Sequence, residues 1–311
     1  MKKRKLKTSA IKKLILVIII LIIAISSMIK TAKYHKTNEY KLKKVGYNKD
    51  EISIIVKEPK ENIDYILNNN YNEIIDDIIN EKYYLNKNLQ EYIEYKNNHQ
   101  EEELSDVIAI INTHADKEEY KETNATDIEK KELMLVNKYN HLDENYKPEN
   151  ITKISPIYAY DENYAPKEVL EQYKKMFNDA QEQGIELIIS SSYRSYEEQK
   201  ETYEYYEQIK GENVKNYASL PGYSEHQTGL AFDILKIGVL TDDFEKTDEF
   251  KWLVNNSYKY GFILRYPKDK EKITKFDYES WHYRYVGTDA AKTIHDENIT
   301  LEEYYAYYIE K

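Results

Sequence analysis

Apolar residues follow two patterns along the first third of the chain. Residues 14–29 (LILVIIILIIAISSMI) form an uncharged run of 16 residues. Between residues 40 and 115 the apolar residues recur instead at helical spacing, and Asn48 followed by Glu51 is typical of a capping box. The recurring positions are Ile63, Ile66, Leu67, Tyr71, Ile74, Ile75, Ile78 and Ile79. The pattern predicts a hydrophobic helix followed by a small set of short helices that act as a packing or spacer module.

The pattern changes again after residue 115. Residues 116–132 (DKEEYKETNATDIEKKE) contain few large apolar residues, which predicts a linker before a domain that spans 133–311. Within this domain, helices and strands alternate. We expect helices over 166–183, 196–209 and 247–260, the second opened by a capping box of Ser195 and Glu198, and strands over 185–191, 229–235 and 281–286.

The charges around the first hydrophobic run decide how we interpret it. Residues 1–13 carry seven positive charges and no acid. A run of 16 residues is slightly shorter than the roughly 17–25 of a spanning helix, but lysines at both ends can snorkel to the interface. A cleaved signal peptide is the alternative, although SSMIKTAKYH offers no convincing small-residue cleavage site. We expect an uncleaved anchor over 14–29, with 1–13 in the cytoplasm and the body outside.

Composition excludes several classes of function. The chain has 45 Lys and Arg against 56 Asp and Glu, a net charge of -11, and the basic N-terminal segment makes the remainder more acidic still. Nucleic acid is therefore an unsuitable partner, since phosphate binding needs clustered basic residues. The chain has no cysteine, which excludes disulfides, thiol catalysis and iron–sulfur clusters. Any metal must be held by His, Asp or Glu.

Two segments supply such ligands. In SEHQTGLAFD (224–233), His226 and Asp233 flank a glycine turn, and strand alternation places Asp233 on the same face as the small Ala231. In ESWH (279–282), an acid precedes a histidine by three residues. His226, Asp233 and His282 would give three ligands and leave a fourth position open, as catalytic zinc requires. Glu279 would then be the general base for the activated water.

A third segment, SYRS (192–195), lies at a predicted strand-to-helix junction with Gln199 nearby. Arg194 there could hold a substrate carboxylate or a developing oxyanion through forked hydrogen bonds. It could also make an ordinary ion pair at a helix start, and a single histidine is more often structural than catalytic. The combination of ligand types, an acid and an arginine in one histidine-poor domain favours a catalytic site.

These segments resemble a known family. SSYRSYEEQ, SEHQTGLAFDI and ESWHYRYVG are similar to VanY-type D-alanyl-D-alanine carboxypeptidases, zinc metallopeptidases grouped with VanX-type dipeptidases and hedgehog-like domains. The similarity covers about 133–287. It implies an α+β fold in which a small antiparallel sheet is flanked by helices. Ser192 departs from the pattern, because many relatives have glycine there.

The resemblance also implies roles for individual residues. It places Zn²⁺ on His226, Asp233 and His282, with Glu279 as catalytic base and Arg194 stabilising the transition state. Gln199 and Ser224 would contact the peptide substrate together with Arg194, while Tyr193, Ser195 and Trp281 would form walls of the site, Trp281 against the substrate. The loop 211–223 is expected to line the pocket.

The function implied is that of a membrane-anchored, extracytoplasmic carboxypeptidase that removes the terminal D-Ala from peptidoglycan stem peptides or their precursor. Three alternatives remain: an LD-carboxypeptidase acting on tetrapeptides, a D,D-dipeptidase, and a non-catalytic zinc-holding module that binds the cell wall. Glu279 argues against the last alternative, since a domain that only holds metal needs no base beside its ligand.

Overall fold

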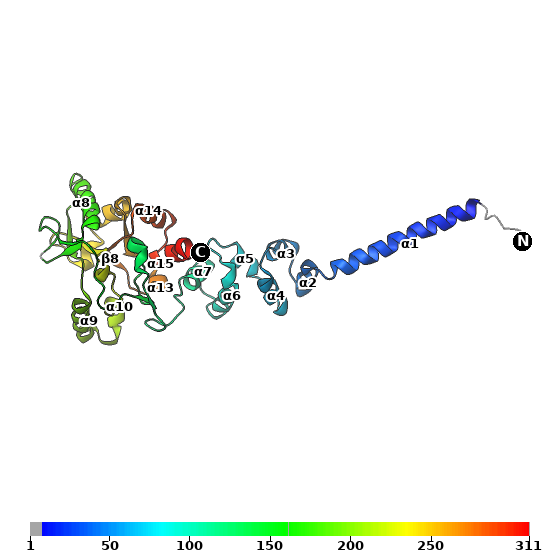
Figure 1. Ribbon diagram of the computed structural model, residues 1–311, viewed down its shortest axis with the longest axis horizontal. Coiled ribbons are helices and arrows are strands. Elements are labelled where there is room, and N and C mark those ends of the chain that lie inside the picture. Colours follow the sequence, from blue (N-terminus) through cyan, green and yellow to red (C-terminus); the bar gives the residue numbers. More distant parts are fainter. Residues whose placement is uncertain (1–7, 161, 311) are drawn as a thin grey trace, which may run out of the picture. The chain divides into compact units, whose positions relative to one another are not determined.

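The computed structural model describes residues 8–160 and 162–310. The chain divides after Ile108 into two compact units, each described by itself (Figure 1). The basic residues at positions 2–7 lie outside the described residues. The division differs from the predicted boundary at residue 133, because the stretch from residue 109 packs with the second unit.

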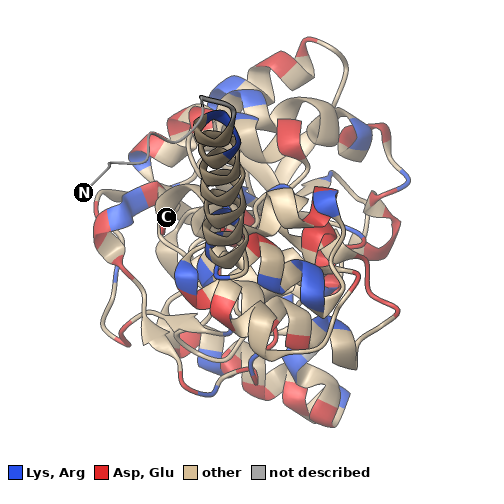
Figure 2. Cartoon of the chain, turned by 90° about the vertical axis from the view of Figure 1, so that its right-hand side faces the viewer, with Lys and Arg blue, Asp and Glu red and all other residues tan. Residues whose placement is uncertain are grey.

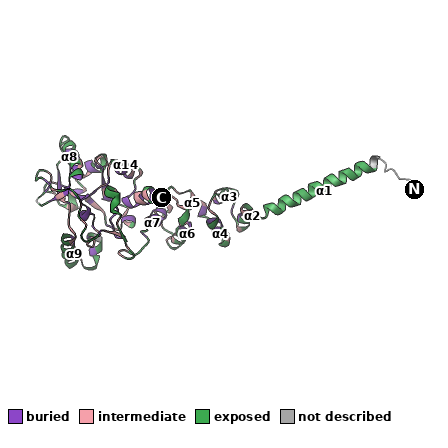
Figure 3. Cartoon of the chain, viewed as in Figure 1, coloured by how far each residue is buried: buried purple, intermediate pink, exposed green. Residues whose placement is uncertain are grey.

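The first unit opens with the long helix α1 (Thr8–Tyr34). Its apolar side chains are exposed along its length (Figure 3), and no charged residue interrupts the stretch between Lys13 and Lys30 (Figure 2). Within the described residues, Ala10–Tyr34 is long and apolar enough to cross a membrane, although a signal sequence has the same properties.

Short helices follow, as the sequence pattern predicts. Leu42, Ile66 and Ile78 are fully buried among them. The capping box is confirmed: Asn48 accepts a hydrogen bond from the backbone N–H of Glu51, whose carboxylate accepts one from the N–H of Asn48. The helices are α2 (Asn38–Val45), α3 (Lys49–Ile55), α4 (Lys60–Asn68), α5 (Ile75–Asn80), η1 (Asn86–Asn88), α6 (Leu89–Asn98) and α7 (Leu104–Asn112), which runs across the division.

The second unit is built around a four-stranded antiparallel sheet of order β5–β6–β8–β7. Its strands are β5 (Leu187–Ser191), β6 (Ala231–Lys236), β7 (Phe262–Tyr266) and β8 (Glu279–Tyr285). Two small ladders accompany it: β1 (Asn124–Ala125) with β2 (Asn140–His141), and β3 (Ile151–Lys153) with β4 (Tyr164–Pro166). The expected small antiparallel sheet flanked by helices is confirmed.

Helices lie on two sides of the sheet, with α8 and α9 on opposite sides of β8 in Figure 1. The apolar face of α8 is buried in the core, where Tyr173 packs edge-on against Phe232 of β6 with ring centroids 5.7 Å apart. The α-helices are α8 (Lys167–Gln181), α9 (Tyr196–Lys210), α10 (Val214–Tyr217), α11 (Thr241–Phe244), α12 (Asp248–Asn256), α13 (Glu271–Thr274), α14 (Thr288–Glu297) and α15 (Leu301–Tyr304). The 3₁₀ helices are η2 (Ile128–Leu133), η3 (Gly211–Asn213), η4 (Glu225–Thr228) and η5 (Ser257–Tyr260), and η6 (Tyr305–Ile309) is a π-helix.

The segment 116–132, expected to be a linker, is instead part of the second unit. Its β1 pairs in parallel with β2, and backbone hydrogen bonds run from Tyr120 to Lys138 and from Asn124 to Tyr139. Glu119 also forms a 2.9 Å ion pair with the buried Lys138. A polar stretch without an apolar face can therefore be held in place by its backbone, which hydropathy does not reveal.

Candidate metal centre and substrate cleft

The central strands of the sheet bring two predicted ligands together. Asp233 of β6 lies directly opposite His282 of β8 in the antiparallel register. Phe232 and Ile234, its neighbours on β6, are fully buried on the core side. Since strand side chains alternate between faces, Asp233 points away from this core, as the sequence pattern predicts.

The third ligand, His226, comes from η4, just before β6. Gly229 ends η4 with φ +69°, and a Cβ there would lie 2.8 Å from Cδ of Pro166. Only glycine accommodates both the left-handed backbone and this close approach. Nδ1 of His226 lies 2.7 Å from the carbonyl oxygen of Ser192 and donates to it in the tautomer that leaves Nε2 free. The turn therefore aims Nε2 of His226 at the sheet.

Ligand atoms of His226, Asp233 and His282 all lie within 4.8 Å of one another. Nε2 of His226 is 3.5 Å from Oδ2 of Asp233, and Nδ1 of His282 is 3.3 Å from Oδ1. Oδ1 of Asp233 is buried and accepts no hydrogen bond from the described residues. Two imidazole nitrogens and a carboxylate converging in this way fit the ligand set of a catalytic zinc ion.

The charges around the triad also favour a cation. Burial lowers the pKa of His226 to about 4, so this imidazole is neutral and able to coordinate a metal. For His282, burial is outweighed by the carboxylates of Asp233 and Glu225, which raise its pKa to about 9. The carboxylates around His282 thus favour a bound positive charge, and a metal ion can replace the proton there.

Glu279 reaches the same site because β8 is irregular. Between the pairs Leu264–Tyr283 and Tyr266–Glu279, β7 advances by two residues and β8 by four, so β8 carries a bulge. Residues three apart on a regular strand face opposite sides of the sheet, yet Oε2 of Glu279 lies 3.4 Å from Nδ1 of His282. Burial raises the pKa of Glu279 to about 7, which suits a group that must accept and return a proton.

Arg194 follows β5 at the edge of the same cleft. Its guanidinium donates to Oε1 of Gln199 and to Oγ of Ser191, both at 2.9 Å, and Gln199 in turn donates to the carbonyl of Ser219. The cleft has a volume of about 500 Å³. Its lining includes Arg194, Gln199, Ser224, His226, Asp233, Glu279, Trp281 and His282, together with Tyr217, Ala218 and Ser219 of the loop 211–223.

All the residues predicted to bind metal or substrate or to act in catalysis therefore line one cleft, and the loop 211–223 contributes to it as expected. Their individual roles remain predictions. Tyr193 lines an adjoining hollow, which shares Arg194 with the cleft. Ser195 lines neither, because its hydroxyl caps α9 by accepting from the N–H of Glu198. Its expected place in the wall of the site stays a prediction.

Glu225 lines the cleft too, and sequence reasoning assigned it no role. Its side chain is fully buried and pairs with Arg265 and Arg284. The sequence does not indicate this pairing, because the two arginines lie 19 residues apart and the register of their strands cannot be read from it. A charged residue beside a predicted ligand was the available signal.

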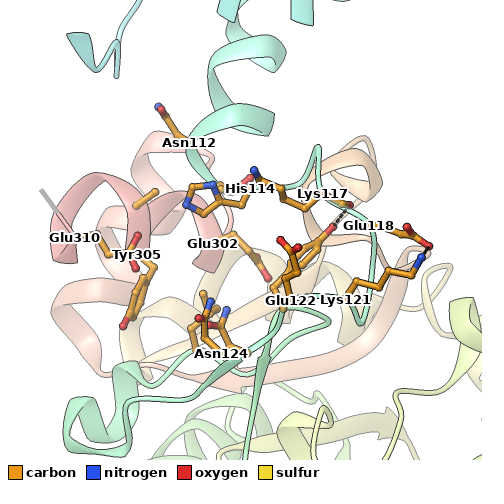
Figure 4. A pocket seen from close by; sticks show the side chains of 15 residues that line it. Asn112, His114, Lys117, Glu118, Lys121, Glu122, Asn124, Glu302, Tyr305 and Glu310 are labelled. Carbon is orange, nitrogen blue, oxygen red and sulfur yellow. Dashed lines mark hydrogen bonds and ion pairs between the residues drawn. The ribbon is translucent and has the colours of Figure 1, made fainter. Parts of the chain in front are cut away.

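A second pocket, of about 510 Å³, lies away from this chemistry. Figure 4 shows residues from the segment after α7, among them His114, on one side of this pocket and Glu302 and Tyr305 near the C-terminus on the other, while Lys121 turns toward Glu118. It shares no lining residue with the cleft, and the one group of three metal-binding side chains found among the described residues lies in the cleft instead. We therefore place the chemistry at the His–Asp–His group.

Comparison with known proteins agrees with this geometry. Residues 162–288, which contain all the predicted site residues, match the VanY family, described as D-alanyl-D-alanine carboxypeptidase. The chain is also 36% identical over 182 residues to VanXYC of Enterococcus gallinarum, a bifunctional D-Ala-D-Ala dipeptidase and carboxypeptidase, covering 56% of this chain and 94% of that protein. The chain belongs to the VanY family.

Two further relatives extend the comparison. The VanY-family chain is 45% identical over 181 residues to YodJ of Bacillus subtilis (strain 168), covering 56% of the chain and 66% of YodJ. The solved structure of the LdcB LD-carboxypeptidase is 42% identical, with a TM-score of 0.56, and covers 60% of the chain and 91% of LdcB. The matches span 57–66% of the length of three curated relatives, less than two thirds in each case.

Proposed function

We propose that this VanY-family protein is a zinc-dependent carboxypeptidase that hydrolyses the C-terminal D-Ala-D-Ala bond of peptidoglycan stem peptides. The observation that carries the proposal is the convergence of His226, Asp233 and His282 with Glu279 in one cleft of about 500 Å³. Arg194 at the edge of this cleft supplies a cation for a substrate that ends in a free carboxylate.

The side chains divide the chemical work. When bound, zinc supplies Lewis acidity for the scissile carbonyl and lowers the pKa of water. Glu279 accepts a proton from the attacking water and delivers it to the leaving amine, a task for which a pKa near 7 is well matched. Arg194, held by Gln199 and Ser191, offers fixed N–H donors for the substrate carboxylate or the developing oxyanion.

An LD-carboxypeptidase acting on tetrapeptide stems is the second candidate. The similarity to the LdcB LD-carboxypeptidase, whose structure the chain covers to 91%, favours it. Both reactions release one terminal D-Ala and use the same groups. The walls of the cleft, including Ala218 and Ser219, would select between the residues that precede the scissile bond.

The experiment that tests the proposal incubates the full chain, in detergent, with pentapeptide and tetrapeptide stems and measures product masses. Loss of one alanine from the pentapeptide that a chelator abolishes and zinc restores is the expected result. Loss from the tetrapeptide alone would replace the DD assignment with the LD one, and release of the dipeptide would indicate a D,D-dipeptidase. A zinc-loaded protein that cleaves none of these substrates would contradict the enzymatic proposal and favour a wall-binding module.

Replacing Arg194 by alanine should reduce turnover without loss of metal. Removal of one oxyanion-type donor commonly lowers kcat by about 100- to 1000-fold. Zinc content should stay at the wild-type level, because Arg194 forms hydrogen bonds with Gln199 and Ser191 and supplies no metal ligand. Turnover would be followed by alanine release and zinc by atomic absorption. A large loss of zinc in Arg194→Ala would refute the assigned role. Arg194→Lys keeps the positive charge but not the forked pair of donors, so its turnover should lie between that of the wild type and that of Arg194→Ala.

We further propose that α1 anchors the protein in the cell membrane, with the cleft on the extracytoplasmic side where peptidoglycan lies. The length and composition of Ala10–Tyr34 and the lysines at 12, 13 and 30 support this placement. Protease added to intact spheroplasts should degrade the body and leave a short membrane-embedded fragment. A protein released into the medium without residues 8–34 would indicate a cleaved signal sequence instead.

A further inference from the structure

A cluster of four buried charges lies directly behind the metal centre. Oε1 of Glu225 accepts hydrogen bonds from Nε of Arg265 and Nη1 of Arg284, both at 2.8 Å. Arg265 also donates two parallel hydrogen bonds to the carboxylate of Glu302 of α15, from Nη1 to Oε2 at 2.8 Å and from Nη2 to Oε1 at 2.5 Å. Two carboxylates and two guanidiniums cancel in charge, so the cluster can be buried without a net charge.

The cluster is tied to several elements and is consequently rigid. Arg284 donates to the carbonyls of Glu132 and Met134, and Glu302 accepts from Nδ2 of Asn137. Arg265 and Arg284 belong to β7 and β8, and neither is exposed. With its Oε1 held by two arginines, the Glu225 carboxylate has a fixed orientation.

The other oxygen of Glu225 points at a metal ligand. Oε2 lies 3.5 Å from Nε2 of His282, and neither buried atom has a hydrogen-bond partner in the part of the chain that the structure describes. One is an acceptor and the other can donate, so a shift of about 0.5 Å would satisfy both. The opposite nitrogen of His282, Nδ1, faces Asp233 and Glu279.

We propose that Glu225 is a positioning residue that holds the proton of His282 on Nε2, so that the lone pair on Nδ1 is directed to the metal. The inference rests on the proposed zinc site. A carboxylate behind a ligating histidine fixes its tautomer and ring orientation and increases its basicity. Two adjacent residues of η4 then contribute to the same metal site: His226 ligates the metal directly, and Glu225 orients the ligand His282.

The variant Glu225→Gln tests this role with little change in shape. Its amide oxygen can still accept from both arginines, which places the NH₂ group opposite Nε2 of His282. Two donors then face each other unless the proton moves to Nδ1, where it blocks coordination. Zinc affinity of the folded full chain, measured by competition with a chromogenic chelator, should weaken by about 10- to 100-fold.

Glu302→Gln is the matched control, because it perturbs the other carboxylate bound to Arg265 without touching His282. Its zinc affinity should remain at the wild-type level. Unchanged affinity in Glu225→Gln would overturn the proposal, and so would equal weakening in both variants, which would indicate general loosening of the cluster. A wild-type chain that binds no zinc would instead overturn the proposed function.

A measurement on the unaltered protein keeps the proposal testable if Glu225→Gln does not fold. Long-range ¹H–¹⁵N spectra of the zinc-loaded chain distinguish the imidazole tautomers, and the chain has only seven histidines to resolve. His282 should show its proton on Nε2 and His226 on Nδ1. A proton on Nδ1 of His282 would contradict the proposed role of Glu225.

Discussion

Replacing Glu279 by glutamine is expected to reduce kcat by about 100- to 10,000-fold while zinc remains bound, because a positioned general base contributes rate enhancements of this size. The amide has nearly the shape of the carboxylate but cannot accept the proton of the attacking water. Glu279 is also not among the three grouped ligands, so the metal should be retained. Alanine release from the stem peptide and zinc per chain would be measured on the same sample.

The pH dependence gives an independent check of this assignment. In the metal-free site, burial raises the pKa of Glu279 to about 7, and a bound cation would lower it. The base is active when deprotonated, so kcat/KM should rise with pH along an acidic limb that lies below pH 7 and is lost in Glu279→Gln. The exposed Glu182→Gln on the far end of α8 should behave as wild type. Wild-type activity in Glu279→Gln would contradict the role of Glu279 as base.

His226→Ala should abolish both zinc binding and turnover. The variant loses one of three ligands, and the remaining Asp233 and His282 cannot enclose the ion. It also removes the hydrogen bond to the Ser192 carbonyl, which joins η4 to the end of β5. Zinc content after dialysis would be measured together with alanine release, and activity should fall to the level of Glu279→Gln or below.

The matched control for this variant is His295→Ala. His295 is a partly exposed residue of α14 that stacks on Tyr258 and contacts none of the three ligands. It should retain wild-type zinc and activity. Full zinc occupancy in His226→Ala would show that the metal lies elsewhere and would remove the basis of the proposed function.

The parts of the site that sequence reasoning located are those with local signals. Alternation over 229–235 predicted the side to which Asp233 points, and the capping box of Ser195 and Glu198 located the start of α9, just beyond Arg194. Each signal lies within a few residues of the feature that it predicts. The side on which Asp233 is placed follows from strand geometry alone.

The parts that were missed depend on contacts between distant segments. β7 was not predicted, and the bulge in β8 that brings Glu279 beside His282 becomes evident only from the pairing with β7. The cluster around Glu225 joins residues up to 77 positions apart, from Glu225 to Glu302. The periodicity of a single segment does not show how that segment pairs with a distant one. The backbone hydrogen bonds that hold 116–132 in the second unit could not be predicted for the same reason.

The order of strands in the sheet has a consequence for how the protein is made. β8 is the last of the four strands in the chain, yet it lies between β6 and β7. Until β8 has been inserted, β6 and β7 each expose an unpaired edge that can capture another chain. The proposed zinc ligands Asp233 and His282 face each other on β6 and β8, on the two sides of the seam that forms when β8 pairs with β6. Metal bound to ligands on both sides of this seam would therefore stabilise the closed sheet relative to the unfolded chain.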